Sequence, residues 1–175
     1  MRISGFACAG VVACAAIVLV SPRALAQSSA APSAVPEWKA WASLSIGPAA
    51  VNGEGLPGGM IALWATHNEY AFSLRAIGAS RLFEVGDVTD FSILAGLHTL
   101  RTAHADAVFL AGAGMSYGHS TATGDRLVRE PVLAGSAQLN FNYVFVGAGL
   151  DAFVGVGPTR RYYGVGLSLA LGAFQ

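Results

Sequence analysis

The chain has 175 residues, with ten basic and ten acidic side chains, a formal net charge of zero and 54% hydrophobic residues. Its length fits one domain, and its balanced charge argues against nucleic-acid binding and against a basic membrane-surface patch. Counted from Gln27, eight basic residues (ten minus Arg2 and Arg23) stand against ten acidic ones, a formal charge of −2.

The first 26 residues have the three parts of a secretory signal peptide. Arg2 gives a positive start, an apolar run covers 3–20, and a small-x-small site ends at Ala26. We therefore predict a cleaved leader at 1–26. An uncleaved anchor helix is the alternative, because the apolar run almost reaches membrane-spanning length. A lipoprotein box ending at Cys14 is disfavoured, because the apolar run continues beyond it.

The chain after the leader carries no cysteine, since Cys8 and Cys14 both lie within the leader. An exported protein without disulfides is held together by burial and backbone hydrogen bonds. Residues 27–36 are rich in Ser, Ala and Pro, which predicts a flexible lead-in. The folded domain is then expected at 37–175.

From residue 37 onward the side chains alternate with a period of two, which is typical of β-strands. In the last run, large residues such as Leu167 and Leu169 alternate with small ones such as Gly166 and Ser168. Each run has about 9–13 residues, close to the length with which a tilted strand crosses a bilayer. The eight predicted strands are 37–46, 58–66, 69–79, 90–100, 107–117, 131–140, 143–152 and 162–174.

The predicted connections alternate between short and long. Short turns at one rim and long loops at the other are typical of an up-and-down outer-membrane barrel, in which the short turns face the periplasm. A chain that begins and ends at the same rim needs an even number of strands, which eight satisfies. The short connections are 66–69, 101–106 and 141–142, and the long ones are 47–57, 80–89, 118–130 and 153–161.

Charged residues are rare inside the predicted strands, where only Lys39, Arg75 and Asp151 occur. A soluble barrel would need polar side chains on the outward face of nearly every strand. On a lipid-facing surface, by contrast, an Arg or Lys at mid-bilayer costs about 2–4 kcal/mol. We therefore expect the apolar phase to face lipid and the small or polar phase to fill a narrow lumen. Arg75 and Asp151 would then join an ion-pair network in that lumen.

The strand phases follow from the alternation, except that Trp38, Trp41, Leu63 and Trp64 place large groups on both phases of the first two strands. Aromatic residues near the run ends predict interfacial girdles; they are Trp38, Tyr70, Phe91, Tyr117, Tyr143, Tyr162 and Tyr163. The outward set is Phe72, Leu74, Ala76, Phe91, Ile93, Ala95, Leu97, Phe109, Ala111, Ala113, Met115, Leu133, Ala137, Leu139, Val144, Val146, Ala148 and Leu150. The inward set is Ser73, Arg75, Ser92, His98, Gly112, Gly114, Ser116, Ser136, Gln138, Asn140, Gly147, Gly149 and Asp151.

These runs resemble the small eight-stranded outer-membrane β-barrel proteins of Gram-negative-type bacteria, most visibly at 91–117 and 130–174. The resemblance implies an all-β, eight-stranded antiparallel up-and-down transmembrane β-barrel in the cell outer membrane. It also implies contact with outer-membrane lipid and with the barrel-assembly machinery, and a monomeric state. Such barrels usually end in an aromatic residue in phase with the lipid-facing set, whereas Phe174 is penultimate and out of phase with Leu171.

No group of residues predicts a catalytic, cofactor-binding or metal site. The histidines lack the spacing of metal ligands on a strand or a helix. The glycine pairs at 112–114 and 147–149 lack the strand–turn–helix context of a phosphate loop. The four histidines are His67, His98, His104 and His119.

We therefore expect a structural, adhesive or otherwise non-enzymatic role in the cell envelope. One alternative is a lipid A-modifying acyl hydrolase, with Ser116 as nucleophile, His119 as base and Asp125 nearby, although a nucleophile needs a base within hydrogen-bond reach. A second alternative is a narrow pore for small solutes. A third is a soluble periplasmic ligand-binding barrel.

Overall fold

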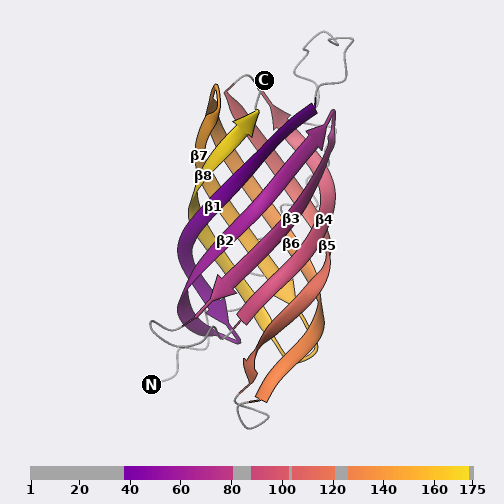
Figure 1. Cartoon of the computed structure of the whole chain (residues 1–175), viewed down its shortest axis with the longest axis vertical. Coiled ribbons are helices and arrows are strands. Elements are labelled where there is room, and N and C mark those ends of the chain that lie inside the picture. Colours follow the sequence, from indigo (N-terminus) through magenta and orange to yellow (C-terminus); the bar gives the residue numbers. More distant parts are fainter. Residues whose placement is uncertain (1–37, 81–87, 103, 121–125, 174–175) are drawn as a thin grey trace. The chain divides into compact units, whose positions relative to one another are not determined.

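The strands of the chain close into one antiparallel barrel, in which each strand pairs with the next and β8 pairs with β1 (Figure 1). The computed structural model describes residues 38–80, 88–102, 104–120 and 126–173. This confirms the all-β, eight-stranded up-and-down fold class. The strands are β1 (Trp38–Val51), β2 (Glu54–His67), β3 (Tyr70–Ala79), β4 (Val88–Arg101), β5 (Ala105–Ser120), β6 (Arg126–Tyr143), β7 (Val146–Val156) and β8 (Arg161–Ala173).

Three predicted features lie outside the described residues. They are the leader at 1–26, the lead-in at 27–36 and the terminal Phe174. No helix in the described part of the chain is long and apolar enough to span a bilayer.

The predicted long loop at 47–57 is wrong, because β1 and β2 continue through it to a two-residue turn. Asn52 has a φ of 51° and Gly53 a φ of 91°. A type I′ hairpin turn needs positive φ at both central residues, and Asn-Gly supplies them most readily. Val51 pairs directly with Glu54 on either side of this turn.

The predicted turn at 141–142 is also wrong. Both residues belong to β6, and the chain reverses one step later, at Val144 and Phe145, so that Tyr143 pairs with Val146. Val144, predicted to face lipid from a strand, therefore lies in the turn.

Three other connections are shorter than predicted, because strand pairing extends into them. The connection at 118–130 shrinks to 121–125, the one at 153–161 to 157–160, and the one at 101–106 to 102–104. Pairing satisfies backbone groups that would otherwise need water, so strands continue as long as a partner lies alongside.

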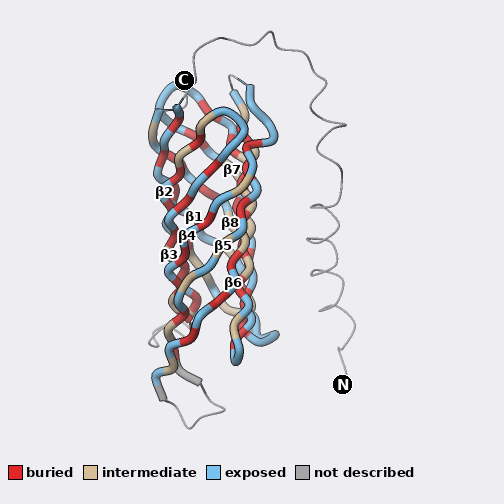
Figure 2. The backbone as a smooth tube through the Cα atoms, turned by 90° about the vertical axis from the view of Figure 1, so that its right-hand side faces the viewer, coloured by how far each residue is buried: buried red, intermediate tan, exposed pale blue. Residues whose placement is uncertain are grey.

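The exterior of the barrel is apolar along the length of the strands. Leu167 is 74% exposed, Leu133 73% and Ile93 70%. Figure 2 shows exposed and buried residues alternating along each strand. Apart from Val144, the predicted outward and inward phases are confirmed. A soluble protein rarely exposes so continuous an apolar surface, whereas hydrocarbon is its natural solvent in a transmembrane barrel.

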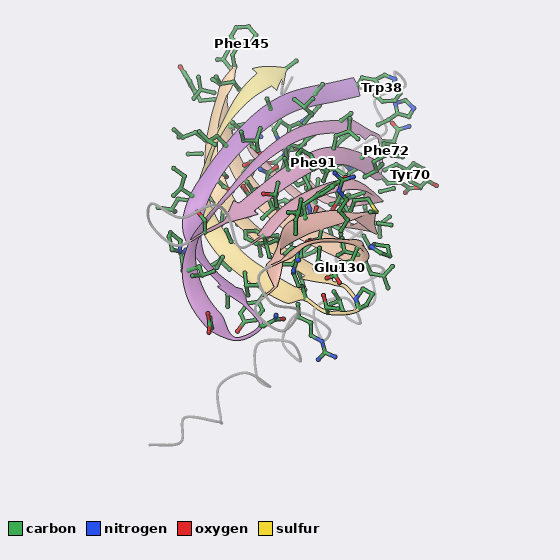
Figure 3. All side chains as sticks on the ribbon, turned by 60° about the horizontal axis from the view of Figure 1, so that its bottom comes forward. Trp38, Tyr70, Phe72, Phe91, Glu130 and Phe145 are labelled. Atoms are coloured by element: carbon green, nitrogen blue, oxygen red, sulfur yellow. The ribbon has the colours of Figure 1, made fainter. Side chains whose placement is uncertain are left out.

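The structure settles the phase of the first two strands. Trp41 and Trp64 point inward, where their rings stack with centroids 6.0 Å apart, while Trp38 is exposed on the outside. Trp38, Tyr70 and Phe145 project away from the barrel (Figure 3). They lie at the rim where β1 begins and β8 ends, which we name the terminal rim; the opposite rim is the distal rim.

One residue of the predicted aromatic girdles faces the other way. Tyr162 is 1% exposed and lies inside the barrel, whereas its neighbour Tyr163 faces outward. An inward tyrosine needs a partner for its hydroxyl group, and Asp90 in the lumen accepts this hydrogen bond.

A matched pair of substitutions tests which part of the exterior lies in hydrocarbon. Leu167→Arg places a charge in the middle of the apolar exterior and is expected to cost about 2–4 kcal/mol of unfolding free energy. Leu127→Arg places the same charge on the distal part of β6 and is expected to cost less than about 0.5 kcal/mol. Urea unfolding in lipid vesicles measures both, and equal costs would contradict the assignment.

The turn at Val144 generates a second prediction. Its φ of 56° lies in the left-handed region, which a β-branched residue rarely adopts. Val144→Gly should therefore stabilise the barrel, by up to about 1 kcal/mol after the entropy cost of glycine. Phe145→Gly is the matched control and should give no gain in urea unfolding. A loss of stability in Val144→Gly would contradict this reading of the turn.

Candidate functional site: the lumen

Asp106 is the centre of a polar network at the terminal end of the lumen. It is 1% exposed. Its Oδ1 atom lies 2.6 Å from His98 Nε2 and 3.5 Å from Lys39 Nζ, and Asn142 donates to its Oδ2 atom. These side chains come from β5, β4, β1 and β6, so the network ties opposite walls of the barrel together.

A bulge in β4 lies beside this network. The pairing of β4 with β5 shifts register between His98 and Leu100. A bulge inserts one residue and redirects the side chains that flank it. Here His98 stays on the inward face, within reach of Asp106, while Thr99 and Leu100 are both exposed.

The stacked tryptophans form the next part of the lumen. Trp41 on β1 donates from Nε1 to Gln138 Oε1 on β6 at 2.9 Å, which is a second contact across the barrel. Trp64 donates from Nε1 to Ser43 Oγ at 2.9 Å. Both indole N–H groups are therefore satisfied, as buried tryptophan requires.

Arg75 reaches across the lumen from β3. It donates from Nη1 to the carbonyl oxygen of Gly135 at 2.6 Å and from Nη2 to that of Val154 at 3.1 Å. The prediction that Arg75 and Asp151 join one ion-pair network is wrong. Arg75 binds backbone carbonyls of β6 and β7, and Asp151 lies beside the side chains of Ser45, Gln138 and Ser168 instead of beside Arg75.

Tyr162 makes a fourth contact across the barrel. Its ring lies over Gly155, where an added Cβ would meet the ring at 2.0 Å, so only glycine leaves room for it. From β8 its hydroxyl group donates to Asp90 on β4, which also accepts a hydrogen bond from Ser92.

The turn between β7 and β8 is held at the distal end of the lumen. Thr159 donates from its backbone nitrogen and its hydroxyl group to Glu130 Oε2, at 3.0 and 2.6 Å. Arg160 is buried and donates to the carbonyl oxygen of Gly118 at 2.6 Å. Figure 3 labels Glu130 in this region. Five sets of contacts thus cross or cap the lumen along its length.

Ser116, the nucleophile of the alternative hydrolase, is 0% exposed and faces the lumen. It pairs with Asp90 on one side and Glu130 on the other. A serine in this place is not presented to lipid around the barrel, so the geometry gives no support to lipid hydrolysis by Ser116. Asp125 and the side chain of His119 lie outside the described residues.

The remaining histidines have separate surroundings. His67 stacks on Trp38 with ring centroids 4.4 Å apart, His98 belongs to the Asp106 network, and His104 lies in an exposed turn. In the described part of the chain, no three His, Cys, Asp or Glu side chains gather as metal ligands would.

Sequence reasoning missed three lumenal residues by assigning them to connections. They are Asp106, Glu130 and Arg160. A signal was present for the first two, because Asp106 continues the inward phase of Val108 and Glu130 continues that of Val132. Arg160 lies in a turn, where no periodicity announces that its side chain is buried.

Several solved structures resemble this barrel, among them Ail, the OprF β-barrel domain and NspA. Ail, the attachment invasion locus protein of Yersinia pestis, has 17% identity and a TM-score of 0.56, covering 78% of this chain and 97% of Ail. The N-terminal β-barrel domain of Pseudomonas aeruginosa OprF has 14% identity and a TM-score of 0.54, covering 78% and 99%. Neisserial surface protein A (NspA) has 10% identity and a TM-score of 0.51, covering 77% and 96%.

These neighbours are small eight-stranded outer-membrane β-barrels, and the chain has their fold. No protein-family model and no curated protein sequence matches the chain. At such low identities the likeness establishes the fold alone, so the function is argued from the chain's own residues.

The Asp106 network predicts a specific pattern of stabilities. Asp106→Asn should cost about 3 kcal/mol of unfolding free energy, because it leaves the Lys39 ammonium group buried without a counter-charge. Lys39→Met combined with Asp106→Asn should be less destabilising than the sum of the two single changes. Urea unfolding in detergent micelles measures the unfolding free energies of the two single variants and the double variant. Strictly additive costs would show that Lys39 and Asp106 do not interact.

Proposed function

We propose that this chain is a non-enzymatic integral protein of the bacterial outer membrane, with a closed lumen and an attachment surface on its β5–β6 hairpin. Lipid of the outer membrane surrounds its apolar exterior, and the barrel-assembly machinery inserts it as a monomer. The distal rim faces the outside of the cell, because the longest connections, from β3 to β4 and from β5 to β6, lie there, and long loops are extracellular in such barrels. The observation that carries the attachment role is the extension of this hairpin beyond its neighbours.

The hairpin extends because β5 and β6 pair with each other after their outer neighbours have ended. Pairing within the hairpin runs to Ser120 and Arg126. On one side, β4 last pairs at Thr89 with Tyr117, and on the other, β7 last pairs at Val156 with Leu133. Figure 1 shows this hairpin projecting past the other strands.

The outward face of the hairpin carries side chains that are common at binding surfaces. The guanidinium carbon of Arg129 lies 5.4 Å from the centre of the Tyr117 ring, within the range of a cation–π contact. Leu127 lies further along the same face and is 59% exposed. Tyrosine and arginine are enriched among the residues that dominate binding energy at interfaces.

A sulfated glycan is a suitable first probe of this surface. Ail, which has the same fold, has been solved in complex with the heparin analogue sucrose octasulfate, at 16% identity to this chain. A guanidinium group binds sulfate-like oxyanions through paired hydrogen bonds, and Arg129 provides such a group on the exposed hairpin.

The lumenal contacts favour attachment over the pore alternative. Lys39–Asp106, Trp41–Gln138, Arg75–Gly135 and Tyr162–Asp90 each connect non-adjacent strands. An eight-stranded barrel has an interior that side chains can fill, and these side chains occupy it.

Attachment is tested by comparing two pairs of Arg and Tyr on the same barrel. Cells that display the protein should bind heparin-coated beads several-fold better than cells without it. Tyr117→Ala with Arg129→Ala should remove most of this gain. Tyr163→Ala with Arg161→Ala is the matched control on β8 and should keep it. Equal effects of the two pairs, at equal surface levels, would contradict a role for the hairpin.

The closed lumen is tested by planar-bilayer recording of the refolded protein. We expect no stepwise conductance above that of the bilayer, because the cross-lumen contacts fill the barrel. Asp106→Ala with Tyr162→Phe removes two of these contacts and should introduce conductance steps. Steady open channels in the unmodified protein would favour the pore alternative.

A further inference from the structure

In the described part of the chain, the projecting end of the β5–β6 hairpin is a ribbon of two strands. Its neighbour β4 last pairs at Tyr117, and its neighbour β7 last pairs at Leu133. A two-stranded hairpin without a third strand is at best marginally stable in water. Pairing nevertheless continues to Ser120 and Arg126, so the ribbon requires support from another part of the barrel.

The turn between β7 and β8, residues 157–160, contacts both strands of this ribbon. From this turn, Arg160 Nη2 donates to the carbonyl oxygen of Gly118 at 2.6 Å and lies 3.4 Å from that of Val128, to which it also donates. Gly118 on β5 and Val128 on β6 are direct partners in the strand pairing. One nitrogen of Arg160 therefore bonds the two strands at the same level of the ribbon.

The preceding residue of the turn makes a second contact with β6. Thr159 donates to Glu130 Oε2 from its backbone nitrogen and its hydroxyl group, at 3.0 and 2.6 Å. Glu130 is buried and lies two residues from Val128 on the same inward face. Two successive residues of the turn thus hold two successive inward positions of β6.

The turn is itself anchored on its other side by the turn between β1 and β2. Asn52 donates from its backbone nitrogen to the carbonyl oxygen of Arg161 at 2.8 Å. In return, the backbone nitrogen of Arg161 donates to Asn52 Oδ1 at 2.9 Å. Gly157 donates from its backbone nitrogen to the carbonyl oxygen of Arg160 at 2.8 Å, which closes the turn. Arg160 therefore reaches the ribbon from a fixed support.

The burial of Arg160 is unusual for its residue type. Its side chain is 2% exposed, whereas the next residue, Arg161, is exposed. Charged side chains are almost never fully buried unless they are paired, because they lose their contacts with water. The burial of this guanidinium group against the ribbon is explained if its hydrogen bonds have a task there.

We propose that Arg160 is a positioning residue, which holds the β5–β6 hairpin in one orientation and thereby fixes Tyr117 and Arg129 on its outer face. Tyr117 and Arg129 pair with each other and are adjacent to the pair that Arg160 contacts. Side chains that are already ordered lose less conformational entropy on binding. The effect on binding rests on the attachment role proposed above, whereas the fixed orientation of the hairpin does not.

The orientation is tested by measuring the distance between two spin labels in the refolded protein. The chain from Gln27 onward has no cysteine, so labelled cysteines can replace Leu127 on the hairpin and Leu169 on β8. Double electron–electron resonance in detergent micelles should give one narrow distance peak. Arg160→Met keeps most of the apolar stem of the side chain and removes its donors, so the peak should broaden.

Arg161→Met is the matched control in the same part of the chain. It removes an exposed guanidinium group and leaves the backbone hydrogen bonds to Asn52 in place. The distance peak should therefore stay narrow. A broad peak in the unmodified protein, or a narrow peak in Arg160→Met, would overturn the proposal.

Urea unfolding separates loss of hairpin orientation from a general loosening of the barrel. Replacing a buried charge by an apolar side chain of similar size is often neutral or stabilising. The unfolding midpoint of Arg160→Met should therefore equal or exceed that of the unmodified protein. A lowered midpoint together with a broadened peak would show general loosening and would reject the positioning role.

Binding of heparin-coated beads measures the consequence for attachment. At equal surface levels, Arg160→Met should reduce bead binding by about two- to tenfold, and Arg161→Met should keep it. If cells with the unmodified protein bind no beads, the attachment role fails, while the spin-label distances still decide the orientation. If Arg160→Met does not refold, NMR of the unmodified protein decides: cross-peaks from the Arg160 guanidinium hydrogens to Gly118 support the contact, and their absence rejects it.

Discussion

The closure of the hydrogen-bonded ring is the constraint on which this structure depends. Hydrocarbon offers no partner to an unpaired backbone N–H or C=O group, so a chain can span it with strands only if no strand edge is left open. Pairing of β8 with β1, from Ala40 with Ala173 to Val51 with Tyr162, closes the ring. Once the backbone is satisfied, each strand can turn apolar side chains outward.

Closure also defines what the interior must do. Polar side chains excluded from the exterior collect in a lumen that is too narrow for bulk water, so they need partners across the barrel. Asp106, Tyr162 and Arg75 meet this need with direct contacts between distant strands. Asp151 lies among the side chains of Ser45, Gln138 and Ser168. The interior thus serves stability, and the attachment role that we propose falls to the extended β5–β6 hairpin.

The sequence predicted the strand phases well, because one alternation determines both the fold class and the facing of each residue. Leu167 outward and Ser168 inward needed no knowledge of the neighbouring strands. Strand ends were predicted poorly. Asn52-Gly53 falls inside the predicted loop at 47–57, although it is a strong hairpin signal, and Asp106 falls inside the predicted turn at 101–106. Its pairing with Lys39 joins residues far apart in sequence, which periodicity alone does not reveal.

The most direct test of this account is a measurement of which faces meet lipid. A single cysteine at Leu169 or at Ala170, in a chain that begins at Gln27, carries a fluorescent probe in vesicles that contain brominated lipid. The probe at Leu169 should be strongly quenched, and Ala170, which faces the lumen, should be labelled poorly in the folded barrel. Quenching at neither position, or strong labelling and quenching at both, would contradict an apolar exterior in contact with hydrocarbon.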